Sequence, residues 1–127
     1  MSQPTKPPKP DFLPKTWLGK FACAFRGAWV GARRYGLSSF AVHLPVMAAV
    51  VALAAWRGVP RVEWLMLILA ITVVLAAELC NSAIEALSRA VTTDYDPRVR
   101  DALDIASGVV LVMSTGAAMV GMVVLFT

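Results

Sequence analysis

The segment WLMLILAITVVLAAELCNSAIEA, residues 64–86, decides the fold of this chain. It belongs to an apolar run over about residues 62–86, and roughly 20 such residues cross a bilayer as an α-helix. The run nevertheless ends with two acids and an amide, Glu78, Asn81 and Glu85. A carboxylate in the hydrocarbon region is costly, so these side chains are candidates for a functional site.

The three polar side chains share one face of the predicted helix. Offsets of three and seven residues, at about 100° per residue, place them within roughly 60° of one another. Glu78 lies roughly 24 Å along the helix from its start, just inside the edge of a hydrocarbon core about 30 Å thick. Glu85 lies about 10 Å further on, at the headgroups or in water. We expect Glu78 to act as a general base toward the hydroxyl of a membrane alcohol, and Glu85 to meet a soluble cofactor and its Mg²⁺.

The whole chain is too apolar for an ordinary soluble domain. Its 127 residues are 58% hydrophobic, with a mean hydropathy of +0.68. Two further runs, about residues 40–56 and about residues 105–126, are long enough to span a bilayer. The sequence therefore predicts an all-α integral membrane protein with three transmembrane helices. Three helices bury little surface on their own, and small-residue pairs such as Ser114/Ala118 permit close helix packing, so we expect a homo-oligomer.

The region before the first span has two parts. Residues 1–14 are rich in Pro and Lys and are expected to form a disordered tail, without the apolar core of a signal peptide. Residues 15–35 carry an aromatic stripe at helical spacing, with most basic residues off that stripe. This pattern predicts an amphipathic helix on the membrane surface. Residues 15–127 are thus interpreted as one membrane domain.

Basic residues gather before the first span and in the loop over residues 88–103. The positive-inside rule places both regions, and hence the N-terminus, in the cytoplasm. A basic tail can also bind nucleic acid, but membrane-flanking charge is the commoner meaning here, so no nucleic-acid partner is expected.

His43 is the single histidine and lies within the first span. Two interpretations stay open: a functional group in the membrane, or a hydrogen bond to a neighbouring helix. Cys23 and Cys80 have no spacing typical of a metal site or a disulfide framework.

Further acids lie where the third span begins. Antiparallel packing brings the end of the second span close to Asp101 and Asp104, with Asp94 in the same loop. Glu85 and Asp104 also have simpler interpretations, as a solvated helix end and as an acid at a helix N-terminus, which is favoured by about 0.3–1 kcal/mol.

Two motifs resemble the bacterial integral-membrane diacylglycerol kinases, a family that includes undecaprenol kinases. They are AELCNSAIEAL (77–87) and, with its Asp 19 positions after Glu85, ALDIASGVVLV (102–112). AFRGAW (24–29) and SSFAVHL (38–44) extend the resemblance over about residues 15–126.

The resemblance implies a homotrimer in the bacterial inner membrane that transfers the γ-phosphate of ATP, with Mg²⁺, to a lipid alcohol at the cytoplasmic face. It implies that Glu78 is the catalytic base and Glu85 the metal ligand. The residues implied to form the nucleotide site are Asn81, Asp94, Tyr95 and Asp104. Those assigned to the lipid cleft are Phe25, Trp29 and Ser39.

The chain departs from the family pattern at two positions. Leu37 stands where the family usually has an acidic metal ligand, and Leu103 where it has a lysine. Arg98 and Arg100 are therefore candidates for the missing phosphate contact. Two other functions stay open: a catalytically impaired pseudo-kinase that binds lipid or regulates a partner, and a small multidrug-type transporter. The transporter ranks last, because that class normally has four spans.

Overall fold

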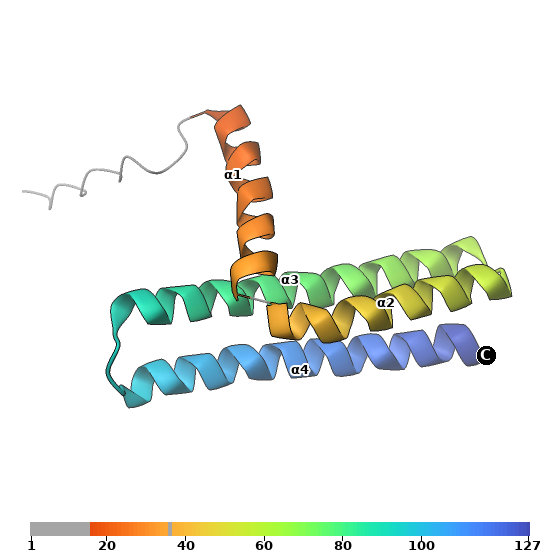
Figure 1. Cartoon of the computed structure of the whole chain (residues 1–127). Coiled ribbons are helices and arrows are strands. Elements are labelled where there is room, and N and C mark those ends of the chain that lie inside the picture. The colour runs from red at the N-terminus through yellow and green to blue at the C-terminus, as the bar shows by residue number, and fades with distance from the viewer. Residues whose placement is uncertain (1–15, 36) are drawn as a thin grey trace, which may run out of the picture.

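The computed structural model describes residues 16–35 and 37–127, apart from the side chains of residues 34–39. Figure 1 shows three long helices side by side as a bundle, with a shorter helix standing across one end of α2. The elements in chain order are α1 (Trp17–Val30), a π-helical turn η1 (Gly31–Tyr35), α2 (Leu37–Arg57), α3 (Arg61–Val91) and α4 (Pro97–Phe126). The predicted tail, residues 1–14, and the Ser39 side chain lie outside the described part. The all-helical prediction is confirmed.

The three long helices, α2 to α4, are each long and apolar enough to cross a membrane. α3 has 31 residues and α4 has 30, so each is about 45 Å long and exceeds a 30 Å hydrocarbon core by about 15 Å. The apolar runs predicted as spans cover only part of these two helices. Each helix continues toward the loop between them because a helix needs no apolar side chains to persist.

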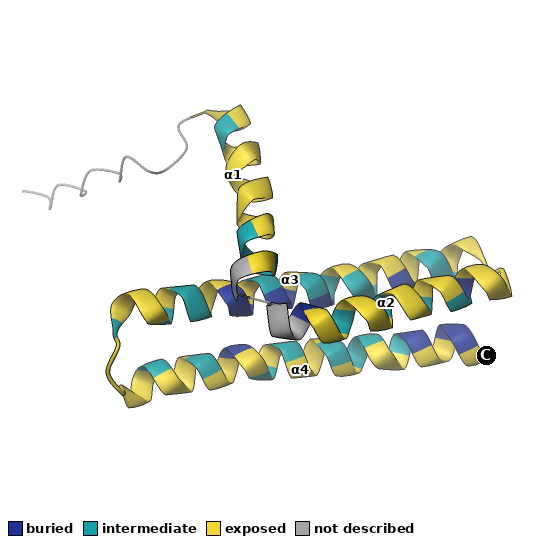
Figure 2. Cartoon of the chain, viewed as in Figure 1, coloured by how far each residue is buried: buried dark blue, intermediate teal, exposed yellow. Residues whose placement is uncertain are grey.

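α1 starts at a defined cap. The Thr16 hydroxyl accepts a hydrogen bond from the Gly19 N–H at 3.1 Å, which satisfies one of the free N–H groups of the first turn. The helix buries none of its side chains, as the exposed colouring in Figure 2 shows, and its aromatic residues lie open. Lys20 Nζ lies 4.4 Å from the ring centre of Trp17, and Arg33 Cζ lies 4.6 Å from that of Trp29. Each of the two tryptophans of α1 thus has a cation over its ring.

The turn η1 brings the chain from α1 onto the bundle, where it packs against α3. Gly31 makes this approach possible: a Cβ added there would lie 2.9 Å from Leu79 Cδ2. Leu79 directly follows Glu78 in α3. The turn η1 thus meets the bundle one residue along α3 from the acid that the sequence predicts to be catalytic.

Two short connections join the long helices. Between α2 and α3, Gly58 adopts a φ of 66°, and the N–H of Val59 donates to the Ala54 carbonyl at 3.3 Å. Between α3 and α4, the Asp96 carboxylate caps α4 by accepting from the Arg98 N–H at 2.8 Å. Both connections are tight, so α3 and α4 form an antiparallel hairpin (Figure 1).

The buried core lies at the end of the bundle that holds the C-terminus. Its centre consists of Ala54, Leu67, Val124 and Leu125. Many large side chains of the same helices remain open, for example Leu69 at 66% and Phe126 at 74% exposure. So much exposed apolar surface is typical of helices covered by lipid or by neighbouring chains.

Candidate active site

Glu78 is buried in α3, with 1% of its surface exposed. Its Oε1 lies 2.9 Å from Nδ1 of His43, which projects from α2. No hydrogen bond of good geometry reaches this oxygen among the described residues, so this is a close polar contact, which is an ion pair when the imidazole is protonated. A buried carboxylate is tolerated when an opposite charge or a donor is this close.

His43 connects Glu78 to the third long helix. Its Nε2 lies 3.2 Å from the hydroxyl oxygen of Ser114 in α4. The side chains of α2, α3 and α4 are thus joined in one polar chain inside the bundle. Of the two interpretations that the sequence left open for His43, the bond to a neighbouring helix is present, and one of its partners is the candidate base.

Asn81 and Glu85 form the next part of the site toward the loop. The Asn81 Nδ2 donates to Glu85 Oε1 at 3.1 Å, across one helical turn. The other side-chain oxygen here, Asn81 Oδ1, and the hydroxyl oxygen of the next residue, Ser82 Oγ, are buried and have no partner among the described residues. Glu85 also lies 3.8 Å from Arg89. This end of the stripe is half-buried and carries unused acceptor atoms.

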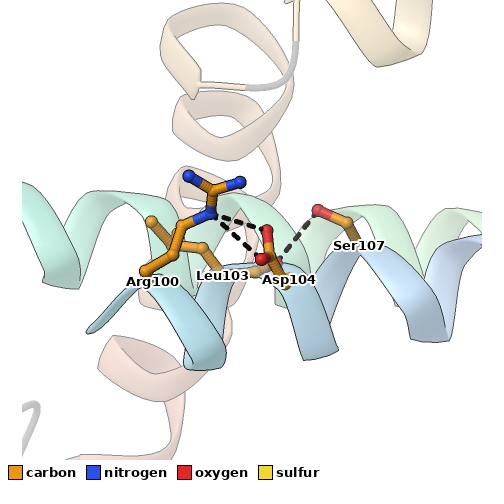
Figure 3. Close-up of polar contacts among 4 residues, drawn as sticks. All are labelled: Arg100, Leu103, Asp104 and Ser107. Carbon is orange, nitrogen blue, oxygen red and sulfur yellow. Dashed lines mark hydrogen bonds and ion pairs between the residues drawn. The ribbon is translucent and has the colours of Figure 1, made fainter. Parts of the chain in front are cut away.

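Asp104 lies on α4 and contacts Arg100 (Figure 3). The Arg100 Nε donates to both carboxylate oxygens of Asp104, at 3.2 and 3.0 Å, and both side chains are more than half exposed. Leu103 is half-buried and accepts a hydrogen bond from the Ser107 hydroxyl through its carbonyl. No hydrogen bond or ion pair joins the Arg100–Asp104 pair to Asn81 or Glu85 among the residues that the structure describes.

The remaining predicted site residues lie outside this cluster. Asp94 and Tyr95 are exposed in the connection before α4, where the Asp94 N–H donates to the Thr92 hydroxyl at 3.0 Å. Phe25 and Trp29 are 78% and 61% exposed on α1. They are free to meet lipid or a second chain.

A cavity of about 300 Å³ lies between α2, α3 and α4. Its wall is apolar, with residues such as Met47, Val74 and Leu125, and its two polar lining residues are His43 and Ser114. The cavity therefore has one polar end, and that end adjoins Glu78.

The model of one protein family, prokaryotic diacylglycerol kinase, matches residues 22–125. The chain belongs to the prokaryotic diacylglycerol kinase family. No curated protein matches the chain. With its three candidate spans, this member of the kinase family is a multi-pass membrane protein.

The metal that the family implies is Mg²⁺, and in this chain it could be held by Glu85 together with substrate and water. The described residues contain no group of three or more His, Cys, Asp or Glu side chains that could enclose an ion. Mg²⁺, however, is usually held by one or two carboxylates together with water and substrate phosphates. The half-exposed Glu85 carboxylate, beside the unpaired Asn81 Oδ1, suits such a shared site.

Sequence reasoning missed one functional candidate and left a second undecided. The sequence indicates only helix packing for Ser114 and leaves two roles open for His43. A signal existed, because a histidine in a membrane span needs a polar partner. In an antiparallel hairpin centred near residue 94, Glu78 lies opposite residue 110, one turn from Ser114. The depth of His43 relative to both could not be read from the sequence.

Proposed function

We propose that this chain phosphorylates a membrane lipid alcohol, diacylglycerol or undecaprenol, with ATP and Mg²⁺ at the cytoplasmic face. The observation that carries the proposal is Glu78, a buried carboxylate in a helix of a kinase-family protein. Burying such a group costs free energy even beside a polar partner, so its presence supports a functional role.

Glu78 serves as the general base. It accepts the proton of the lipid hydroxyl as that oxygen attacks the γ-phosphorus of ATP, and the bond from the γ-phosphorus to the bridging oxygen breaks. The products are the phosphorylated lipid and ADP. Burial of Glu78 supports this role, because excluding water protects the phosphoryl group from hydrolysis.

Asn81 and Glu85 serve the nucleotide end of the site. Glu85 would hold Mg²⁺, which when bound neutralises charge on the phosphates. The hydrogen bond from Asn81 fixes the direction of the Glu85 carboxylate and leaves the Asn81 Oδ1 available as an acceptor. Asp94, Tyr95 and Asp104 complete the nucleotide side from the cytoplasmic loop and the start of α4.

Arg100 supplies the cation that the family places at Leu103. Its Nε is used by Asp104, and its terminal nitrogens make no hydrogen bond within the described ranges. Those nitrogens point away from Asp104 in Figure 3, so they are available for phosphate oxygens. Arg98, which is exposed in the first turn of α4, is a second source of positive charge at the same end.

The working assembly is a homotrimer in the bacterial inner membrane, with the N-terminus in the cytoplasm. α1 crosses the direction of the spans in Figure 1, so it runs along the membrane surface when the spans cross the bilayer. Phe25 and Trp29 then border the cleft that admits the lipid, whereas the assignment of Ser39 to it rests on the sequence alone.

The test is a phosphorylation assay of the purified protein with ATP, Mg²⁺ and either diacylglycerol or a polyprenol. We expect the wild type to form phosphorylated lipid and Glu78→Gln to lose turnover by at least about 100-fold. The matched control is Glu63→Gln, which removes an acid from the other end of the same helix and leaves activity unchanged.

Other outcomes identify the other functions. Tight binding of a lipid alcohol without turnover would establish the pseudo-kinase, which the leucine at position 103 favours. Proton-coupled movement of a substrate across vesicles would establish a transporter. Either result would refute the kinase.

A further inference from the structure

The polar chain from Ser114 through His43 to Glu78 has no assigned role in the phosphorylation proposed above. Its two contacts, 3.2 and 2.9 Å, link three helices that otherwise meet mostly through apolar side chains. A carboxylate acting as a base must be held within a narrow range of positions. Glu78 needs a partner on another helix for this, because neighbouring side chains of α3 move with it.

The His43 ring can hold Glu78 in position whether the ring is neutral or protonated. In the neutral ring with the proton on Nδ1, Nδ1 donates toward Glu78 and Nε2 accepts from the Ser114 hydroxyl. In the charged ring both nitrogens donate, and the Ser114 oxygen accepts. Ser114 can therefore keep a proton on the nitrogen that faces Glu78 in both cases.

We propose that His43 is a positioning residue that holds one carboxylate oxygen of Glu78, while the other oxygen meets the lipid hydroxyl. Ser114 in turn fixes the orientation of the His43 ring. This inference rests on the proposed function, because it assigns His43 a part in the same phosphoryl transfer.

The first test compares three variants on α2 in the lipid phosphorylation assay. His43→Leu should lower kcat by about 10- to 100-fold with little change in KM for the lipid, because the base is misplaced and not lost. His43→Asn keeps an N–H donor near the position of Nδ1 and should recover most of kcat. Met47→Leu, which alters the same cavity wall one turn away, should match the wild type. A kcat of His43→Leu within twofold of the wild type, or of His43→Asn as low as that of His43→Leu, would overturn the proposal.

A double variant separates positioning from structural damage. In a Glu78→Gln background, His43→Leu should cause no further loss of the residual turnover, because the group that it positions is already gone. A full additional loss would mean that His43 acts independently of Glu78 and would refute the assignment. Circular dichroism and gel filtration of each variant verify that the helices and the assembly persist.

A spectroscopic readout is independent of turnover. His43 is the single histidine, so protein labelled with ¹⁵N-histidine and purified through a histidine-free tag gives imidazole signals of this residue alone. Glu78→Gln and Ser114→Ala should each shift those resonances, whereas Met47→Leu should not. Unshifted signals in Glu78→Gln would overturn the pairing itself. If Glu78→Gln shifts the signals but the wild-type protein phosphorylates no lipid, the pairing stands and the proposed function is overturned.

Discussion

At the scale of single residues, the molecule places a buried acid beside a histidine and an exposed acid beside an arginine. Glu78 and His43 lie inside the bundle, whereas Asp104 and Arg100 face outward. The two pairs thus differ in their surroundings. The buried pair suits proton transfer from a lipid hydroxyl, and the exposed pair suits contact with a charged, soluble nucleotide.

Arg100→Ala tests the exposed pair. We expect it to lower kcat/KM for ATP by about 100-fold, because removing one donor to an oxygen that gains charge in a transition state costs about 100- to 1,000-fold in an oxyanion hole. Arg100→Lys should retain part of the activity, since lysine supplies charge without the planar fork. Initial rates at varied ATP and saturating lipid give the comparison.

The control for this experiment is Arg57→Ala, which removes an arginine from the last turn of α2, at the other end of the bundle from Arg100. Adding Leu103→Lys to Arg100→Ala should restore part of the rate. Unchanged kcat/KM in Arg100→Ala would remove this residue from the site.

The polar stripe could be derived from the sequence, whereas its partners could not. Asn81 and Glu85 are four residues apart, and helical geometry alone brings them together. The contact between His43 and Glu78 depends on how α2 is placed along α3, which no local pattern encodes. The pairing of Arg100 with Asp104 spans one helical turn and could have been predicted from that spacing. The sequence pattern, however, indicated only phosphate binding for Arg100.

At the scale of elements, the helices follow from the lengths of the apolar runs. Their ends follow from other causes: α3 continues through polar residues to Val91, and α4 begins at the Asp96 cap. The sequence did not predict the π-helical turn that begins at Gly31, where a Cβ would lie only 2.9 Å from Leu79 Cδ2. Hydropathy alone thus indicates which segments are helical, and side-chain contacts decide where they stop.

Gly58→Ala tests the turn between α2 and α3. Gly58 has a φ of 66°, and a Cβ added there would meet nothing within 4 Å. The substitution should therefore destabilise the fold by about 1 kcal/mol through backbone conformation alone. The midpoint of thermal unfolding in detergent, followed by circular dichroism, measures this effect.

The matched control is Gly27→Ala, which has the same open space but lies within α1. It should be neutral or stabilising, because alanine favours a helix over glycine by up to about 1 kcal/mol. Equal midpoints for the two variants would contradict the explanation.

At the scale of the whole molecule, one chain leaves most of its apolar surface uncovered. Leu111 and Val112 of α4 are each 69% exposed, and α1 has no buried residue. Lipid can cover this surface, and in the proposed homotrimer a neighbouring chain would cover part of it.

The proposed homotrimer predicts a definite mass. Native mass spectrometry of protein released from nanodiscs should give three times the protomer mass of 13.6 kDa. Mixing Glu78→Gln chains with Arg100→Ala chains should raise turnover above that of either variant alone when sites are shared between chains. A fully active monomer would refute the trimer.

The continuity of α3 has a consequence for the membrane in which the protein works. Glu78, Asn81 and Glu85 are fixed along one rod that is longer than the bilayer is thick, so hydrophobic mismatch decides which of them lies level with the headgroups. A thicker membrane submerges Glu85, and a thinner one lifts Glu78 toward water. Turnover should therefore pass through a maximum as the acyl chains of the host lipids are lengthened, and a flat profile across a nanodisc series would show that the chain tilts or deforms the bilayer to compensate.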